Sequence, residues 1–272
     1  VVDVVTGGGD ISLENLGGPV DAKSGGGDIE ATKINRELSI TTGGGDIEIE
    51  EVNSDLKVTT GGGDIELMQV KGITEIQTGG GDIEVKDCGD ALTIRTGGGD
   101  IEAVNIKNAL SIRTGGGDIH VGEIWGECSV ITGGGDVYAK TIIGATEVTT
   151  GGGQVELEDL QGALKVKTGG GDVYAEITLK DYTVDHHIDV ETGCGEIELV
   201  LPATLPASFK VVLETQKRHW QDYAIRSDFP LKIDTQTEGW SRRIIATGDI
   251  NGGGDTIRIY SQCGDIIIKK GR

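Results

Sequence analysis

The sequence Thr-Gly-Gly-Gly-Asp-Ile, or a close variant of it, recurs along most of this chain. The first glycine of each triplet follows the previous one at a constant spacing of 18 residues, without a slip over ten copies: Gly7, Gly25, Gly43, Gly61, Gly79, Gly97, Gly115, Gly133, Gly151 and Gly169. A strict period of this kind is typical of a solenoid, in which each copy forms one coil and stacks on its neighbours. The repeat therefore indicates architecture more directly than chemistry.

Two short strands are expected in every coil. When each coil is numbered from its first glycine as position 0, apolar residues alternate at positions 4 and 6 and again at 13 and 15, and Thr or Ser follows at 17. Such alternation is the pattern of a strand with one buried face. The glycine triplet forms one turn, and positions 9 to 12 form the other. We therefore predict an all-β fold, a parallel β-solenoid with 18-residue coils.

The regular pattern breaks after Ala175. An insertion of six residues around 179–187 delays the next copy, and residues 201–246 are irregular. The sequence therefore predicts two regions. Regular coils occupy residues 1–178, and residues 179–272 continue the solenoid with inserted loops and an irregular C-terminal cap.

The strand pattern returns over residues 257–268. In this alignment Asn251–Asp255, which reads Asn-Gly-Gly-Gly-Asp, falls in the turn opposite the glycine triplets. This segment therefore imitates the repeat motif and is not another copy of it.

The chain of 272 residues carries a formal net charge of −21. This acidity argues against nucleic acid or an anionic membrane as a partner, and no apolar run is long enough to span a membrane. The acids gather at the outward positions 3, 5 and 7, so one face of the solenoid is acidic. A solvated face that prevents aggregation explains this, and a surface for cations or a basic partner is the alternative.

An aspartate stands at position 3 of nearly every coil. Carboxylates stacked about 4.8 Å apart repel one another, so each requires a compensating interaction. We expect each Asp to cap backbone N–H groups of its own glycine turn, without a cofactor. The alternative is a column of Ca²⁺ ions, whose candidate ligands are Asp46, Asp64, Asp82, Asp100 and Asp118.

The four cysteines occupy two kinds of position. Cys88 and Cys128 fall where other coils carry aliphatic residues, so we expect small buried side chains. Cys194 and Cys263 replace the middle glycine of the motif. A disulfide between them would require the irregular segment to loop out of the stack entirely, so we expect no such bond.

Signals for enzymatic chemistry are weak. Asp185, His186, His187 and Asp189 form a compact group of metal-ligating residue types in the insertion, where exposed polar residues are expected anyway. The chain shows no nucleophile elbow, Cys-x-x-Cys pair or phosphate-binding loop. We therefore expect a protein without enzymatic activity. The least favoured alternative is a polysaccharide-active β-helix enzyme, which would need acidic residues with different roles in one groove.

Several segments together resemble a known bacterial family. They are the strands that read apolar-x-Thr-x-x-Gly-Asp-Ile, followed by Ser227–Leu231, Gly248–Gly254 and Cys263–Ile266. With these motifs the whole chain looks like the YvlB-like adhesin family, a domain of unknown function with β-strand repeats. The resemblance implies a β-solenoid in a cell-envelope setting, and it carries over no catalytic residue.

We therefore expect a structural or adhesion-type solenoid of the bacterial cell envelope or exterior, with a cytoplasmic location as the alternative. Residues 1–6 already match the last strand of a coil, so we expect a fragment or processed chain. Its uncovered strand edges predict either end-to-end association or a missing N-terminal cap. An unidentified protein or glycan is the other expected partner. Its candidate contact residues are Trp220, Tyr223, Phe229 and Trp240. A cation- or ligand-binding module that uses the acidic face is the alternative function.

Overall fold

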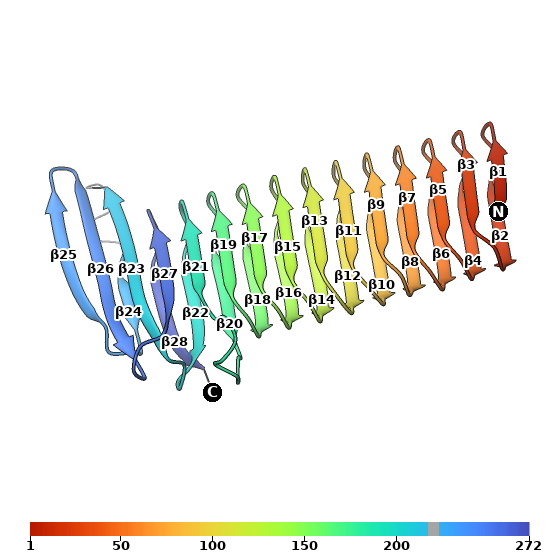
Figure 1. Ribbon diagram of the computed structural model, residues 1–272. Helices are drawn as coiled ribbons and strands as arrows, with labels where there is room; N and C mark the ends of the chain where they lie inside the picture. The colour runs from red at the N-terminus through yellow and green to blue at the C-terminus, as the bar shows by residue number, and fades with distance from the viewer. Residues whose placement is uncertain (217–222, 272) are drawn as a thin grey trace. The chain divides into compact units, whose positions relative to one another are not determined.

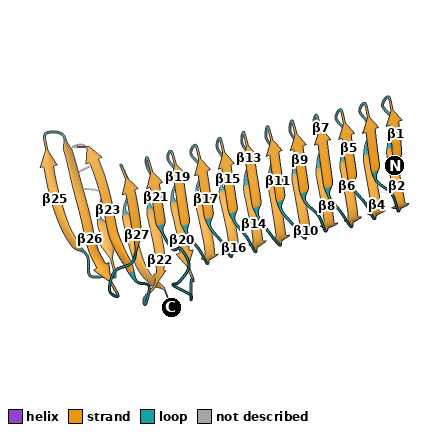
Figure 2. Cartoon of the chain, viewed as in Figure 1, coloured by secondary structure: helices purple, strands orange, loops and turns teal. Residues whose placement is uncertain are grey.

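The computed structural model describes residues 1–216 and 223–271, and it contains two compact units. Unit 1 is Val1–Gly133 and unit 2 is Gly134–Arg272. Regular structure in both units consists of strands, and no helix occurs in the described residues (Figure 2). Both units contain stacked parallel strands of a β-solenoid, so the predicted fold class is confirmed.

Unit 1 contains two parallel sheets whose strands alternate along the chain (Figure 1). The first sheet contains β1 (Val2–Thr6), β3 (Val20–Ser24), β5 (Leu38–Thr42), β7 (Leu56–Thr60), β9 (Thr74–Thr78), β11 (Leu92–Thr96), β13 (Leu110–Thr114) and β15 (Cys128–Thr132). The second contains β2 (Ile11–Leu16), β4 (Ile29–Ile34), β6 (Ile47–Val52), β8 (Ile65–Val70), β10 (Ile83–Cys88), β12 (Ile101–Ile106) and β14 (Ile119–Ile124). Equivalent positions of successive coils pair with each other, as Ile83 does with Ile101.

The inward positions of the coils form a continuous apolar core. In the coil built from β10 and β11, Ile83, Val85, Cys88, Leu92 and Ile94 are each at most 2% exposed. Because side chains alternate across a strand, positions 4 and 6 and then 13 and 15 point into the space between the two sheets. Each large aliphatic side chain buried there contributes about 1.5–3 kcal/mol, and the aliphatic residues repeat in every coil.

A left-handed residue at position 8 moves the following residue into the core. The angle φ is 58° at Lys33, 61° at Glu51 and 58° at Asp87. Lys86 and Cys88 pair with the next coil, whereas Asp87 between them is left out of the ladder. This left-handed residue shifts the alternation of side chains by one residue, so that position 9 faces inward. A left-handed non-glycine residue is uncommon, and the sequence pattern did not predict it.

The glycine triplet is required at its two outer positions and not in its middle. A Cβ atom on Gly97 or Gly99 would lie far inside contact distance of a carbonyl oxygen of the preceding coil, whereas one on Gly98 would meet nothing within 4 Å. Gly99 also has a φ of 89°. The close approach of stacked backbones therefore selects glycine at positions 0 and 2.

The hydroxyl residue at position 17 caps the glycine turn from inside, as the inward phase of this position predicts. Ser24 Oγ accepts the N–H of Gly27 at 2.9 Å, and its hydroxyl donates to the carbonyl oxygen of Gly9 in the preceding coil, also at 2.9 Å. Thr42 makes the same link to Gly27, at 3.0 Å. In these coils one buried hydroxyl thus satisfies a donor of its own turn and an acceptor of the neighbouring turn. In other coils the hydroxyl donates within its own turn instead, as Thr96 does to the carbonyl oxygen of Gly98 at 2.6 Å.

Unit 2 begins with regular coils and then departs from the period. Its strands are β16 (Val137–Ile142), β17 (Thr146–Thr150), β18 (Val155–Leu160), β19 (Leu164–Thr168), β20 (Val173–Ile177), β21 (Ile188–Thr192), β22 (Ile197–Pro202), β23 (Ala207–Gln216), β24 (Ile225–Ser227), β25 (Lys232–Glu238), β26 (Ser241–Ile250), β27 (Asp255–Ser261) and β28 (Ile266–Gly271). Leu164 pairs with Ile188, and the equivalent turn residues Asp172 and Glu196 are 24 positions apart. The insertion of six residues is therefore confirmed.

The last coil of the chain is not the last element of the stack. Ile188 pairs with Ile257 and Thr192 with Ser261, so β27 lies directly against β21 in the expected register. The long strand β23 pairs with the other side of β27, and β26 and β25 follow it as antiparallel strands (Figure 1). The irregular segment therefore covers the final coil instead of separating it from the preceding one.

We expect the two kinds of glycine to respond differently to a single methyl group. Gly99→Ala should lower the free energy of unfolding by more than about 3 kcal/mol, because the new Cβ collides with the Gly81 carbonyl group and φ is unfavourable. Gly98→Ala should change it by less than about 1 kcal/mol. Urea unfolding of the two variants measures this difference, and equal losses would contradict the stacking explanation.

Candidate functional site

The Asp column, position 3 of each coil, links neighbouring coils. Asp82 donates its N–H to Asp64 Oδ1 at 2.8 Å, and Asp100 donates to Asp82 Oδ1 at 2.8 Å. Capping of backbone N–H groups is therefore confirmed, but the donor belongs to the next coil and not to the same glycine turn. The prediction that each Asp caps its own turn was wrong in this respect, because the position-17 hydroxyl caps that turn.

Every Asp that was a candidate calcium ligand takes part in this ladder. The N–H groups of Asp46 and Asp64 donate to the preceding carboxylates at 2.9 and 2.8 Å, and Asp118 donates to Asp100 at 2.8 Å. The glutamates at position 5 also stack in register beside the column, as Glu84 does on Glu102. Calcium binding along this acidic face stays a prediction.

Two substitutions of Asp82 separate capping from charge. Asp82→Ala removes the acceptor of the Asp100 N–H and should lower the free energy of unfolding by about 1–2 kcal/mol. Asp82→Asn retains a carbonyl acceptor and removes one of the stacked charges, so its loss should be smaller than that of Asp82→Ala. Urea unfolding without calcium measures both, and an Asn variant as unstable as the Ala variant would contradict the capping role.

Cys194 and Cys263 form a disulfide, with their Cα atoms 4.6 Å apart. The prediction that they do not bond was wrong. The irregular segment between them does loop out, because β23 and β26 lie beyond the final coil. The two cysteines therefore occupy the middle position of the glycine turn in neighbouring coils, where a side chain has room.

The other two cysteines are buried and free, as predicted. Cys88 and Cys128 are each at most 1% exposed. Burial raises the pKa of the Cys128 thiol to about 12, and it also raises the pKa of Cys88. Both act as small core residues and not as reactive thiols.

The disulfide predicts a thiol count and a loss of stability. Unfolded but unreduced chain should expose two reactive thiols, and reduction should raise the count to the four cysteines of the sequence. The double substitution Cys194→Ala/Cys263→Ala should lower the free energy of unfolding by about 2–4 kcal/mol, because it removes a cross-link that closes a long loop. Thiol titration and urea unfolding test this, and four thiols without reductant would contradict the bond.

An open pocket in unit 2, the cap pocket, has a volume of about 1210 Å³ and contains the disulfide in its wall. Its lining includes five acids and three aromatic residues: Asp172, Glu196, Glu214, Glu238, Asp265, Tyr223, Trp240 and Tyr260. No Lys or Arg belongs to the described lining. Aromatic rings together with carboxylates are suited to a cationic group.

Several lining acids are held in place by hydrogen bonds. Glu214 accepts the hydroxyl of Tyr260 at 3.3 Å and that of Ser241 at 3.5 Å. Asp265 accepts the N–H of Ala224 at 2.8 Å and forms an ion pair with Arg226. Glu214 and Asp265 are therefore both held in fixed positions in the wall of the cap pocket.

The predicted contact residues do not all lie together. Tyr223 and Trp240 line the cap pocket, and Trp240 is 76% exposed. Phe229 is 4% exposed and lies 5.8 Å from Phe209 between ring centroids, so it belongs to the core of the cap and cannot serve as a contact residue. Trp220 lies outside the described residues.

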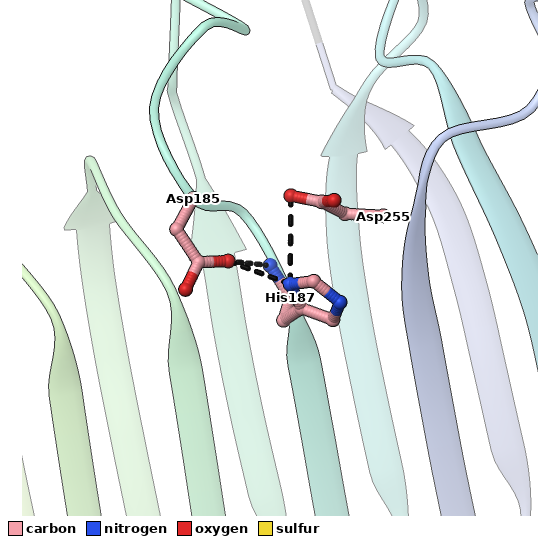
Figure 3. Close-up of side chains that lie close together, drawn as sticks. All are labelled: Asp185, His187 and Asp255. Atoms are coloured by element: carbon pink, nitrogen blue, oxygen red, sulfur yellow. Dashed lines mark hydrogen bonds and ion pairs between the residues drawn. The ribbon is translucent and has the colours of Figure 1, made fainter.

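The insertion between β20 and β21 brings a second group of polar side chains together (Figure 3). His187 Nδ1 lies 2.6 Å from Asp185 Oδ1 and 3.5 Å from Asp255 Oδ2. The hydrogen bond between its ring and Asp185 raises the pKa of His187. The hydrogen bond from the backbone N–H of His187 lowers the pKa of the Asp185 carboxyl group. Asp189 is not part of this group, because it forms an ion pair with Arg258.

His186 is a buried residue, although an exposed loop was expected at this position. It is 5% exposed. Its Nδ1 lies 2.9 Å from the carbonyl oxygen of Val184, and its Nε2 lies 3.1 Å from that of Pro206. Its backbone N–H donates to Asp255 Oδ2 at 3.0 Å. His186 thereby fixes the insertion against the start of β27, a role for which the sequence carries no signal.

Comparison with known proteins gives one match. A family model described as Toastrack DUF4097, a domain of unknown function, matches residues 2–121 and 86–269. No curated protein and no solved structure matches the chain. Within the described residues, no helix is long and apolar enough to cross a membrane.

Proposed function

The chain belongs to the Toastrack family, whose function is unknown, and we propose that it is a non-enzymatic, adhesion-type structural solenoid of the bacterial cell envelope. In this proposal the regular coils form a spacer and the cap pocket contacts the partner. The observation that carries the proposal is the cap pocket, which combines aromatic side chains, among them the exposed Trp240, with carboxylates at the place where the repeat ends.

The disulfide supports a location outside the cytoplasm. Disulfides persist in oxidising compartments and are rare where thiols are kept reduced. The Cys194–Cys263 bond and the resemblance to YvlB-like adhesins therefore both favour the cell envelope or exterior. End-to-end self-association stays a prediction, which sedimentation of the full chain at several concentrations would test.

The partner group that best fits the cap pocket is a basic side chain. A guanidinium or ammonium group can lie over the ring of Trp240 or Tyr223 while it pairs with Glu214, and each such ring contact contributes about 0.5–2 kcal/mol. The net charge of −21 also accelerates encounter with a basic partner. We therefore propose a partner protein that presents Arg or Lys, and treat a neutral glycan as the competing outcome.

Binding of a tetra-arginine peptide to the full chain tests this proposal. At physiological ionic strength, Trp240→Ala and Glu214→Gln should each weaken binding at least about fivefold, because they remove a ring contact and a counter-charge. Calorimetry or fluorescence anisotropy measures the affinity.

Two matched controls lie in unit 1. Trp125 is an exposed tryptophan with Lys107 Nζ 3.3 Å from its ring centroid, and Glu48 is an exposed acid of β6. Trp125→Ala and Glu48→Gln should leave the affinity unchanged. Equal losses in these controls would show general charge attraction instead of a pocket, and binding of a neutral oligosaccharide but not of the peptide would favour a glycan partner.

A further inference from the structure

Three potential metal ligands from two distant segments converge in unit 2 (Figure 3). Asp185 and His187 belong to the insertion between β20 and β21, and Asp255 is the first residue of β27. Each of the three residues offers one ligand atom, and these three atoms all lie within 4.8 Å of one another. The set shares no residue with the cap pocket.

The backbone beneath these side chains is held by a buried residue. His186 donates its N–H to Asp255 Oδ2, and both of its ring nitrogens lie within 3.1 Å of carbonyl oxygens, those of Val184 and Pro206. The two residues that flank His186 are Asp185 and His187. The same contacts that bury His186 therefore place both flanking side chains beside Asp255, as a supporting shell does in metal sites.

The donor set distinguishes between metals. One imidazole nitrogen and two carboxylate oxygens are ligands that Zn²⁺ and similar first-row divalent ions accept. Ca²⁺ prefers six to eight oxygen ligands, and three donors that include a nitrogen do not provide them. The arrangement therefore favours a zinc-type ion.

The distances are compatible with such an ion after a small movement. Ligands about 2.0–2.2 Å from Zn²⁺ in a tetrahedral site lie about 3.3–3.6 Å from each other. The separation of 3.5 Å between His187 Nδ1 and Asp255 Oδ2 already fits, whereas that of 2.6 Å between His187 Nδ1 and Asp185 Oδ1 must widen. The side chains of Asp185 and His187 are 69% and 59% exposed, so they can move apart and leave a fourth position for water.

We propose that Asp185, His187 and Asp255 bind one divalent transition-metal ion of the Zn²⁺ class, independently of the proposed adhesion function. The ion replaces the hydrogen bond between His187 and Asp185 and joins the insertion to β27. Because it binds the folded chain and not the separated segments, it stabilises unit 2.

Titration of the EDTA-treated full chain with ZnCl₂, followed by calorimetry and thermal unfolding, tests the proposal. We expect one Zn²⁺ per chain, a rise in the unfolding temperature, and a much weaker response to CaCl₂. His187→Ala and Asp255→Asn should each lower the zinc affinity by at least about tenfold. The Asn variant retains an acceptor for the His186 N–H, so its fold should persist, which its unfolding temperature in EDTA verifies.

His120→Ala is the matched control, because His120 is an exposed histidine beside stacked acids on the regular coils of unit 1. This variant should bind zinc as the unchanged chain does. Unchanged zinc affinity in His187→Ala and Asp255→Asn would overturn the proposal. So would loss of binding in His120→Ala alone, or the absence of any zinc-dependent heat or thermal shift.

Discussion

Close stacking of backbone on backbone at the glycine turn is the constraint on which the other features of the coils depend. At Gly97 and Gly99 the preceding coil leaves no room for a Cβ atom. Every coil must therefore return its glycines to the same place, which explains why the spacing of 18 residues does not slip. Each residue then lies beside its own copy in the neighbouring coil, as Ile94 lies beside Ile112.

This in-register stacking is energetically favourable for apolar side chains and unfavourable for charged ones. Stacked aliphatic side chains fill a continuous core, but stacked carboxylates repel one another. In the Asp column, hydrogen bonds to the backbone offset this repulsion. Asp64 Oδ1 accepts the N–H of Asp82, so each carboxylate extends the hydrogen-bonded ladder between neighbouring coils. These hydrogen bonds account for the acidic column without a bound ligand. The acidic face alone therefore does not define a binding site.

The close stacking does not restrict the middle position of the glycine triplet, and the disulfide occupies that position. At this position a side chain points into open space, so Cys194 and Cys263 are accommodated where Gly98 stands in a regular coil. The two cysteines are 69 residues apart in the sequence, yet the stacking of their coils brings their Cα atoms to 4.6 Å from each other. The sequence did not predict this bond, because the irregular segment was expected to separate the two cysteines. In the structure β23 and β26 instead lie beyond the final coil and cover it.

The repeat made the strands, the inward aliphatics and the register of β27 predictable, because each depends on a periodic contact. The left-handed corner at Asp87 and the burial of His186 were not predictable, since each depends on one local conformation or on one distant partner. Only Asp185 and His187 of the proposed metal ligands were visible as a group in the sequence.

Asp255 shows why the third ligand was hidden. It ends the sequence Asn-Gly-Gly-Gly-Asp, which imitates the repeat, but it lies in the opposite turn, away from the Asp column. Its Oδ2 accepts the N–H of His186 and faces His187 instead. A residue type that is structural in nearly every regular coil thus becomes available for binding once the period is broken, and this connects the candidate sites of unit 2 with the end of the regular repeat.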